Sequence, residues 1–448
     1  MAKFLRQVAI WSGTRPGRFV MERVQARALR RTVRHAARNS PFYRERFREH
    51  GIDPRRIRTA RDLGQLGFFT TPADFAENEG RFLAVPADRV VHACASSGTS
   101  GEPKFVRFSR WDWVRLVFGG AIGLEAGGVT QADVVLVMLA FGSPEWMTGI
   151  VAVEMFRIVG CLTVPASTTH PTGTLLGMME RFRPSVLVGI PSFIWKLTEE
   201  GSQIADLKRF GVRMIRLGGE PLGPGLRARL EEAWGAGVFD TYGMTECGYV
   251  VAGESEAGGG LHVNSRVVVE VVDPAGDRVL PDGDVGELVF TTLEQEATPF
   301  LRYRSGDLGS LCPGGGTFFG QTIAKVIGRR DDMVIVGSGV NLFPEGVEKA
   351  LLRIPGVLGF QLLVEGESYR DRITIRLEAG PGAPPEAELS RRVRGALADA
   401  VPGLEHEIAG EGTLDEPRVE VVAPGSLAGG SGRKVPRVLD RRARSRDR

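Results

Sequence analysis

The fold is decided by an apolar run in the first third of the chain, Asp133-Val-Val-Leu-Val-Met-Leu-Ala140. A second run of the same kind, Ser185-Val-Leu-Val-Gly-Ile190, follows a predicted helix over residues 149–159 and a short apolar stretch over residues 161–164. Short apolar runs that alternate with helical patterns are typical of strands covered on both faces. The pattern therefore predicts a mostly parallel, covered sheet of α/β type.

The same alternation extends on both sides of these runs. The further predicted elements are an Arg-rich helical pattern within residues 20–50 that ends at Asn39-Ser40-Pro41, helices over 194–200 and 224–234, and a strand over 214–217. After about residue 250 the helical patterns give way to predicted strands. Val267–Val272 and Gly286–Thr292 are separated by turn sequences rich in Asp, Pro and Gly. This part is predicted to be a β-meander or a small barrel.

A domain boundary is predicted close to Arg329. Beyond it the sequence predicts a helix over 343–352, strands over 357–364 and 372–377, a Gly- and Pro-rich turn over 379–385, a helix over 386–400 and a strand over 418–422. That is enough for a compact α+β domain. We therefore expect a large multi-subdomain N-terminal domain over residues 1–329, with parallel sheets and a small β-barrel-like part. A small C-terminal domain would occupy residues 330–448, with a solvated Arg-rich end.

Composition narrows the class of protein. The chain has 448 residues, of which 42% are apolar and 25% charged, in the proportions of a globular protein. Its 57 basic and 54 acidic residues leave a net charge of +3, so bulk charge provides no reason to expect nucleic acid as a partner. The four cysteines are scattered, as free thiols in a reducing compartment would be. No signal peptide and no membrane span are visible, and we expect a cytoplasmic enzyme whose oligomeric state, a homodimer included, stays open.

The segment that points most directly to chemistry is Ala95-Ser-Ser-Gly-Thr-Ser-Gly-Glu-Pro-Lys104. Hydroxyl groups and glycines at this density let backbone N–H and side-chain O–H groups surround phosphate oxygens. No Gly-Lys-Ser/Thr sequence closes the loop, so it is not a Walker loop. Taken alone, the segment could also be an ordinary turn.

Three further segments occur downstream in a fixed order: Leu217-Gly-Gly-Glu-Pro221, Asp240-Thr-Tyr-Gly-Met-Thr-Glu-Cys-Gly248 and Arg302-Tyr-Arg-Ser-Gly-Asp-Leu308, the last with an acid after a strand-like stretch. In this order the four segments resemble those of the adenylate-forming superfamily, which includes acyl-CoA synthetases, luciferase-like enzymes and peptide-synthetase adenylation domains. The resemblance is greatest to the phenylacetate-CoA ligase group. The segments that are typical of that group are Asn39-Ser-Pro-Phe-Tyr-Arg-Glu-Arg46, Phe69-Thr-Thr-Pro72, Gly328-Arg-Arg-Asp-Asp-Met333 and Gly339-Val-Asn-Leu-Phe-Pro344.

The resemblance implies a nucleotide site. Its β- and γ-phosphates would be held by Ser96, Ser97, Gly98, Thr99, Ser100 and Gly101, with Lys104 nearby. At the adenine, the resemblance implies contacts from Gly219, Glu220 and Pro221, with Tyr242 stacked on the ring. Asp240, Gly243 and Met244, which flank Tyr242, would belong to the same site. At the ribose, the implied contacts are Asp307 and Arg329. Thr245 would contact the α-phosphate and Glu246 would bind Mg²⁺.

The resemblance also implies a mobile catalytic lysine. Lys434, in Gly432-Arg-Lys-Val-Pro-Arg-Val-Leu-Asp440, would reach the carboxylate and the α-phosphate during adenylation, with a hinge at Asp331. The family usually has Gly directly before this lysine, where this chain has Arg433. A carboxylate that attacks a phosphate must meet another anion, so a cation here would stabilise the transition state. The other interpretation of Lys434 is a solvated residue of a basic tail.

The acid would lie between the apolar strands. By resemblance its pocket would be lined by Phe141, Gly142, Ser143, Pro144, Ile190, Pro191, Leu217 and Gly218. Aromatic and small side chains suit a planar ring. The Tyr- and Gly-rich run usual in this group is altered to Phe141-Gly-Ser-Pro144, so the acid need not be phenylacetate.

The sequence thus predicts ATP-dependent conversion of a small, aromatic carboxylic acid to its acyl-adenylate with release of pyrophosphate, followed by transfer to the thiol of coenzyme A. Two alternatives stay open: loading of the phosphopantetheine arm of a carrier protein, or transfer of AMP to another acceptor on the same fold. A DNA-binding function would rest only on the Arg-rich tail. Some relatives hold Zn²⁺ with Cys and His, but here only His262 and Cys312 remain, and Ser255 and Gly314 stand where cysteines would be expected.

Overall fold

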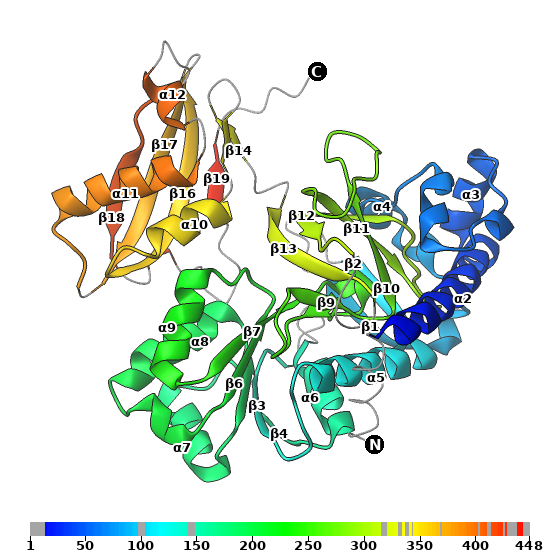
Figure 1. Cartoon of the computed structure of the whole chain (residues 1–448), viewed down its shortest axis with the longest axis horizontal. Helices are drawn as coiled ribbons and strands as arrows, with labels where there is room; N and C mark the ends of the chain where they lie inside the picture. The colour runs from blue at the N-terminus through cyan, green and yellow to red at the C-terminus, as the bar shows by residue number, and fades with distance from the viewer. Residues whose placement is uncertain are drawn as a thin grey trace. The chain divides into compact units, whose positions relative to one another are not determined.

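A computed structural model of the chain describes residues 14–96, 104–141, 148–314, 320–329, 334–336, 340–342, 344–367, 370–380, 382–401, 404–409, 414–423, 426–427 and 437–441. Contacts divide the chain into two compact units, one of residues 1–222 and 230–326, the other of residues 223–229 and 327–448 (Figure 1). The separate roles predicted for a large and a small domain stay predictions. No helix in the described ranges is both long and apolar enough to span a membrane.

The first unit begins with helices that are delimited by capping residues. Ser40 ends the first long helix and caps the next, because its hydroxyl accepts a hydrogen bond from Tyr43 N while Pro41 occupies the first turn. Thr71 and Asp74 form a capping box, and so do Ser109 and Asp112. The helices that follow from these signals are α2 (Arg15–Asn39), α3 (Pro41–Glu49), α4 (Pro72–Phe82) and α5 (Arg110–Ala126), with short 3₁₀ turns η1 (Pro54–Arg56), η2 (Ala60–Leu66) and η3 (Ala87–Arg89).

One mixed sheet of eleven strands forms the framework of this unit (Figure 1). Five strands are parallel in the order β4-β3-β5-β6-β7: β3 (Val134–Met138), β4 (Leu162–Pro165), β5 (Val186–Gly189), β6 (Met214–Gly218) and β7 (Gly237–Tyr242). Their connections include α6 (Thr148–Val159), α7 (Thr172–Phe182), α8 (Pro191–Ser202), η5 (Leu207–Phe210) and α9 (Pro224–Trp234). This confirms the predicted parallel α/β architecture.

The remaining strands of the sheet follow β7 in the order β8-β9-β13-β12-β11-β10. They are β8 (Ala252–Gly253), β9 (Leu261–Val263), β10 (Val267–Val272), β11 (Gly286–Thr292), β12 (Tyr303–Leu311) and β13 (Thr322–Arg329). The antiparallel pairs β10–β11 and β11–β12 confirm the predicted meander. Hydrogen bonds join these strands to the parallel half in a single mixed sheet. A separate hairpin pairs β1 (Val90–Ser96) with β2 (Lys104–Ser109).

The second unit has a four-stranded sheet in the order β18-β17-β16-β19. Its strands are β16 (Val357–Glu367), β17 (Arg370–Ala379), β18 (Arg418–Val422) and β19 (Val438–Asp440), with α10 (Pro344–Leu351), α11 (Glu386–Ala400), α12 (Leu404–Ala409) and the pair β14 (Val334–Val336) and β15 (Val340–Leu342). Buried residues of the sheet, such as Leu362 and Ile375, share a core with Leu389 and Val393 of α11. The predicted α+β character of this part is confirmed.

Candidate active site

The carboxyl ends of four parallel strands bring most of the predicted segments to one edge of the sheet. Register places Met138 of β3 beside Gly189 of β5, Gly189 beside Leu217 of β6, and Leu217 beside Asp240 of β7. Parallel strands end at the same edge, and in open α/β sheets ligands bind there. The segments that leave the sheet at this edge include Phe141, Ile190 and Pro191, Gly218 to Pro221, and Tyr242 to Glu246.

The segment after β6 is tied to the segment after β5. Backbone N and hydroxyl of Ser192 each donate a 2.9 Å hydrogen bond to the carboxylate of Glu220. Ser192 lies in the first turn of α8, where the exposed N–H groups favour an anion. Gly219 has φ +84°, a conformation that residues with a side chain rarely adopt. The predicted adenine segment is therefore a fixed turn rather than a free loop.

A second tight turn carries Thr245 and Glu246. A Cβ on Gly243 would lie 1.4 Å from the carbonyl oxygen of Tyr249, so only glycine fits there. Tyr249 N donates to Met244 O at 2.8 Å and closes the turn around η6 (Thr245–Cys247). The turn fixes the backbone direction from which Thr245 and Glu246 project.

Glu246 is held by two residues of the antiparallel half of the sheet. The hydroxyl of Tyr303 in β12 donates to Glu246 Oε1 at 2.9 Å, and Gln295 Nε2 donates to the backbone carbonyl of Glu246 at 3.0 Å. Tyr303 is 3% exposed and Gln295 1% exposed. Neither residue was among the predicted site residues. Tyr303 lies inside a quoted motif, whereas nothing local in the sequence marks Gln295.

Asp307 reaches the site through an irregularity in β12. The β11–β12 register passes from Glu287 opposite Leu308 to Val289 opposite Arg304, so three residues of β12 oppose one residue of β11. Gly306, with φ +76°, donates its N–H to Glu287 Oε1 at 3.0 Å. Bulges of this kind redirect side chains near active sites. The expectation that Asp307 follows a strand is therefore wrong in detail, because Asp307 lies within one.

The bulge brings Asp307 to the predicted adenine-stacking residue. The hydroxyl of Tyr242 donates to Asp307 Oδ2. Burial, and then the neighbouring carboxylate, raise the pKa of Tyr242 well above its usual value, so the hydroxyl stays protonated. The ring of Tyr242 also stacks on Phe290 of β11, with centroids 5.9 Å apart.

The β1–β2 hairpin begins and ends the predicted phosphate segment. Ser96 pairs with Lys104, while Ser97, Gly98, Thr99, Ser100 and Gly101 lie outside the described residues. Burial raises the pKa of the Cys94 thiol to about 12, and the carboxylate of Glu246 adds to this effect. Strand β1 contacts η6, the turn that contains Glu246. Lys104 Nζ donates to the carbonyl of Pro72 at 3.4 Å. The segment thus starts beside the turn that holds Thr245 and Glu246.

Other predicted residues have different environments. The carboxylate of Asp240 accepts a hydrogen bond from Thr241 N, and the backbone N–H of Asp240 donates to Glu254. Arg329 is exposed at the end of β13 and belongs to the second unit. Besides residues 97–101, the predicted residues outside the described ranges are Gly142, Ser143, Pro144, Asp331 and Lys434. Segment 432–440 ends in β19, which pairs in parallel with β16.

The carboxylate of Glu246 has oxygen atoms of the kind that bind Mg²⁺. Tyr303 occupies Oε1, and within the described part of the chain Oε2 accepts no hydrogen bond. Groups of three or more metal-binding side chains are absent from those same residues.

His262 lies in a buried hydrogen-bonded cluster. Its Nε2 is 3.0 Å from the hydroxyl of Ser255, and its Nδ1 is 3.3 Å from the hydroxyl of Thr322. Burial lowers the pKa of His262, which favours the neutral ring. The thiol of Cys312 donates to the carbonyl of Gly259 at 3.5 Å. Both ring nitrogens of His262 therefore have hydroxyl partners. All four cysteines of the chain are free, as predicted.

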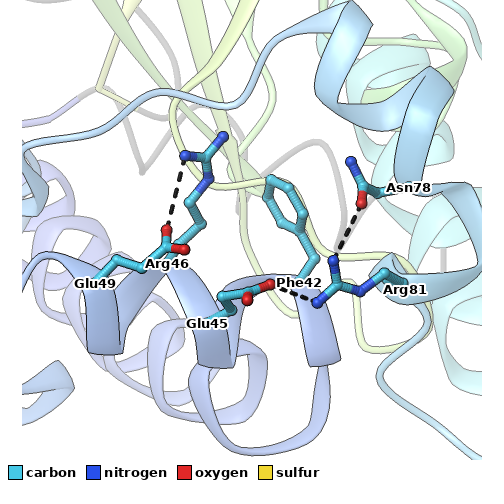
Figure 2. Close-up of a pocket in the computed structure, with 6 residues that line it drawn as sticks. All are labelled: Phe42, Glu45, Arg46, Glu49, Asn78 and Arg81. Carbon is cyan, nitrogen blue, oxygen red and sulfur yellow. Dashed lines mark hydrogen bonds and ion pairs between the residues drawn. The ribbon is translucent and has the colours of Figure 1, made fainter.

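Figure 2 shows a pocket of about 130 Å³ on α3 and α4, lined by Phe42, Glu45, Arg46, Glu49, Asn78 and Arg81. Its charges are paired internally. The guanidinium of Arg81 lies 2.5 Å from Glu45 Oε2 and 3.3 Å from Asn78 Oδ1. The pocket contains none of the predicted nucleotide or acid residues, so it is not the candidate site.

Two N-terminal motifs that lie away from this edge of the sheet hold the start of β12 in place. Tyr43 accepts a 2.9 Å hydrogen bond from Leu301 N, and its oxygen lies 3.0 Å from the hydroxyl of Thr70. Thr70 in turn forms a bridge to Tyr303. Residues of the Asn39–Arg46 and Phe69–Pro72 segments therefore fix the start of β12, the strand that carries Tyr303 and Asp307.

Comparison with known proteins agrees with this arrangement. Residues 44–293 match the AMP-binding enzyme family, and residues 339–442 match the AMP-binding enzyme C-terminal domain. The phenylacetate-coenzyme A ligase of Aromatoleum evansii is 33% identical over 94% of both chains, and that of Thermus thermophilus is 31% identical over 94% of this chain and 96% of the relative. A crystal structure of 2-hydroxyisobutyryl-CoA ligase with 2-HIB-AMP superposes with a TM-score of 0.81 at 25% identity, over 94% of this chain and 89% of that chain. The chain therefore belongs to the family of AMP-binding, adenylate-forming enzymes, in the group that resembles phenylacetate-CoA ligases.

Proposed function

We propose that the protein activates a small aromatic carboxylic acid with ATP, forming an acyl-adenylate and pyrophosphate, and then transfers the acyl group to the thiol of coenzyme A. The general class, an AMP-forming acid–thiol ligase, follows from the family and from relatives named phenylacetate-coenzyme A ligase. The aromatic acid is the finer part of the proposal. It is supported by those names and by Phe141, which follows the end of β3 by three residues.

One observation carries the proposal above the others. Thr245 and Glu246 lie on a turn after β7, and the hydroxyl of Tyr242, the last residue of β7, donates a hydrogen bond to Asp307 of β12. The residues proposed for the α-phosphate, the metal and the ribose thus lie on connected elements of one unit, which supports the proposal. Reactions of two anions depend on such positioning and on neutralised charge.

The residues divide the work of adenylation. Tyr242 would stack on the adenine, Asp307 would accept the ribose hydroxyls, and Thr245 would donate to the α-phosphate. Glu246 would hold Mg²⁺, whose charge offsets that of the phosphates. Lys434, from the second unit, would meet the substrate carboxylate and the α-phosphate, and its removal afterwards would admit the thiol. The acid would lie against Phe141, Ile190 and Leu217.

Acid-dependent exchange of labelled pyrophosphate into ATP tests the first half of the reaction. The panel would contain phenylacetate, benzoate and anthranilate, with 2-hydroxyisobutyrate as the aliphatic comparison, since a structural relative binds its adenylate. We expect exchange with at least one aromatic acid. Exchange with the aliphatic acid alone would refute the aromatic preference, and no exchange with any acid would refute the proposed activity.

The acceptor needs a separate assay. Acyl-adenylate formed in the first step would be offered coenzyme A or a carrier protein that bears phosphopantetheine, and thioester formation would be followed by mass spectrometry. The proposal predicts faster transfer to coenzyme A. Preference for the carrier protein would assign the chain to the alternative class of stand-alone loading enzymes.

A further inference from the structure

Both the side chain and the backbone carbonyl of Glu246 accept hydrogen bonds from residues outside its own turn. Its side chain accepts the hydroxyl of Tyr303 at 2.9 Å through Oε1, and Oε2 accepts no hydrogen bond from the residues that the structure describes. Its backbone carbonyl accepts Gln295 Nε2 at 3.0 Å. A carboxylate on a short turn could otherwise rotate about its side-chain torsions, and every orientation lost on metal binding would cost free energy.

Tyr303 has little freedom to leave Glu246. Its ring is 3% exposed and packs edge-on against Phe300, with centroids 5.1 Å apart. Its backbone forms a bridge to Thr70, whose N–H donates to Arg302 O at 3.0 Å and whose carbonyl accepts Arg304 N at 2.8 Å. The position of the Tyr303 hydroxyl is therefore fixed by strand pairing and by core packing, not by a loop.

Gln295 is fixed by a different set of contacts. Its Nε2 also donates to the carbonyl of Thr298 at 2.6 Å. The next two backbone N–H groups, those of Glu296 and Ala297, donate to the carboxylate of Asp112 at 2.6 and 2.9 Å. The segment that presents Gln295 is thus anchored to the first turn of α5.

We propose that Tyr303 and Gln295 are positioning residues for the metal site: together they orient Glu246 so that its Oε2 is directed to the divalent cation that accompanies ATP. This inference rests on the proposed function, which makes Glu246 the metal ligand. Mg²⁺ demands near-ideal octahedral geometry, so a carboxylate whose second oxygen is already fixed binds it with less loss of freedom. Neither residue touches the reacting atoms.

The test measures metal binding apart from turnover. Full-length protein with a non-hydrolysable ATP analogue would be titrated with Mn²⁺, and free Mn²⁺ would be counted by electron paramagnetic resonance. In Tyr303→Phe we expect the Kd of Mn²⁺ to rise about five- to tenfold, the effect of one lost hydrogen bond to a charged group. Affinity for the analogue without metal should stay unchanged. Phe keeps the packing against Phe300, so the variant should fold.

The matched control is Tyr249→Phe, because it removes another buried tyrosine hydroxyl from the same core. It should leave the Kd of Mn²⁺ unchanged. A double-mutant cycle with Glu246→Gln isolates the pair: adding Tyr303→Phe to Glu246→Gln should have no further effect on Mn²⁺ binding. An unchanged Kd in Tyr303→Phe, or an equal rise in Tyr249→Phe, would overturn the inference.

Two further outcomes are distinguishable. Should Tyr303→Phe not fold, Gln295→Met is titrated in its place: a Kd raised about fivefold supports the inference, and an unchanged Kd overturns it. If wild-type protein exchanges pyrophosphate with an acid while both variants bind Mn²⁺ normally, the positioning inference alone fails. If wild-type protein exchanges with no acid, the proposed function fails.

Discussion

At the scale of single residues, one hydrogen bond joins two predicted parts of the nucleotide site. Tyr242 and Asp307 are 65 positions apart in the chain, yet the phenol donates to the carboxylate. A ribose hydroxyl would then donate a hydrogen bond to the carboxylate of Asp307, which Tyr242 already orients. Tyr242 would then have two functions, stacking through its ring and orientation through its hydroxyl.

The variant Tyr242→Phe separates these two functions. It keeps the ring beside Phe290 and removes the donor to Asp307. We expect the apparent Kd of ATP to rise roughly tenfold, about 1.4 kcal/mol, because a hydrogen bond to a charged group is lost. Isothermal titration calorimetry would measure it. Binding as tight as in the wild type would remove Tyr242 from the orientation of Asp307.

Gly243→Ala tests the turn that carries Thr245 and Glu246. The new Cβ would lie 1.4 Å from Tyr249 O, so the backbone must move. We expect a loss of about 3 kcal/mol or more in the free energy of unfolding, together with loss of pyrophosphate exchange. Gly123→Ala in α5 is the control, since its Cβ would meet no atom within 4 Å and alanine favours helix. Equal stability of the two variants in urea unfolding would contradict this account.

At the scale of elements, β12 connects the core to the site. Buried ion pairs anchor both sides of the segment that precedes Asp307. Arg302 Nε lies 3.0 Å from Glu270 Oε2, and Arg304 Nη2 lies 2.7 Å from Glu287 Oε2. The guanidinium of Arg302 also lies over Phe69, 3.9 Å from the ring centre. The strand is therefore locked where its side chains reach the predicted nucleotide residues.

The prediction for this element concerns Glu270→Ala. It would leave the buried guanidinium of Arg302 without its carboxylate, and the free energy of unfolding should fall by about 3–5 kcal/mol. Glu180→Ala is the control, because Glu180 pairs with Arg209 on the surface, with side chains 59% and 52% exposed. Its loss should cost less than about 1 kcal/mol. Comparable losses in the two variants, measured by denaturant unfolding, would show that β12 is not anchored in this way.

The elements also show what the sequence could predict. Strand β11 and helices α9 and α11 have the predicted bounds, because local apolar periodicity and turn residues define them. The sequence predicts Asp307 after a strand, whereas the bulge at Ser305-Gly306-Asp307 lies inside β12, because Leu308 and Gly309 pair with β11 again beyond the bulge. Gln295 was missed for a related reason: its function depends on Glu246, 49 positions away.

At the scale of the whole molecule, the chain consists of two units, and the predicted site draws on both. The first unit contains Tyr242, Thr245, Glu246 and Asp307, while Lys434 belongs to the second. In the second unit, Arg437 O accepts a 2.8 Å hydrogen bond from Leu362 N, so the segment that follows Lys434 is anchored to the sheet.

Lys434→Ala should therefore separate the two half-reactions. Adenylation needs a cation near the carboxylate and the α-phosphate, so acid-dependent pyrophosphate exchange should fall about 10²–10³-fold. Transfer of the acyl group from supplied acyl-adenylate to coenzyme A should change little. Arg433→Ala is the control for the neighbouring charge and should retain exchange. Unchanged exchange in Lys434→Ala would exclude Lys434 as the catalytic lysine.

The central claim is that separate segments of the chain meet on one nucleotide. The most direct test is a crystal structure with a stable sulfamoyl analogue of the acyl-adenylate. We predict adenine against the ring of Tyr242, ribose hydroxyls on the carboxylate of Asp307 and the sulfamoyl group beside Thr245. A nucleotide bound elsewhere, for example in the pocket between Arg46 and Arg81 (Figure 2), with none of these contacts, would contradict the account.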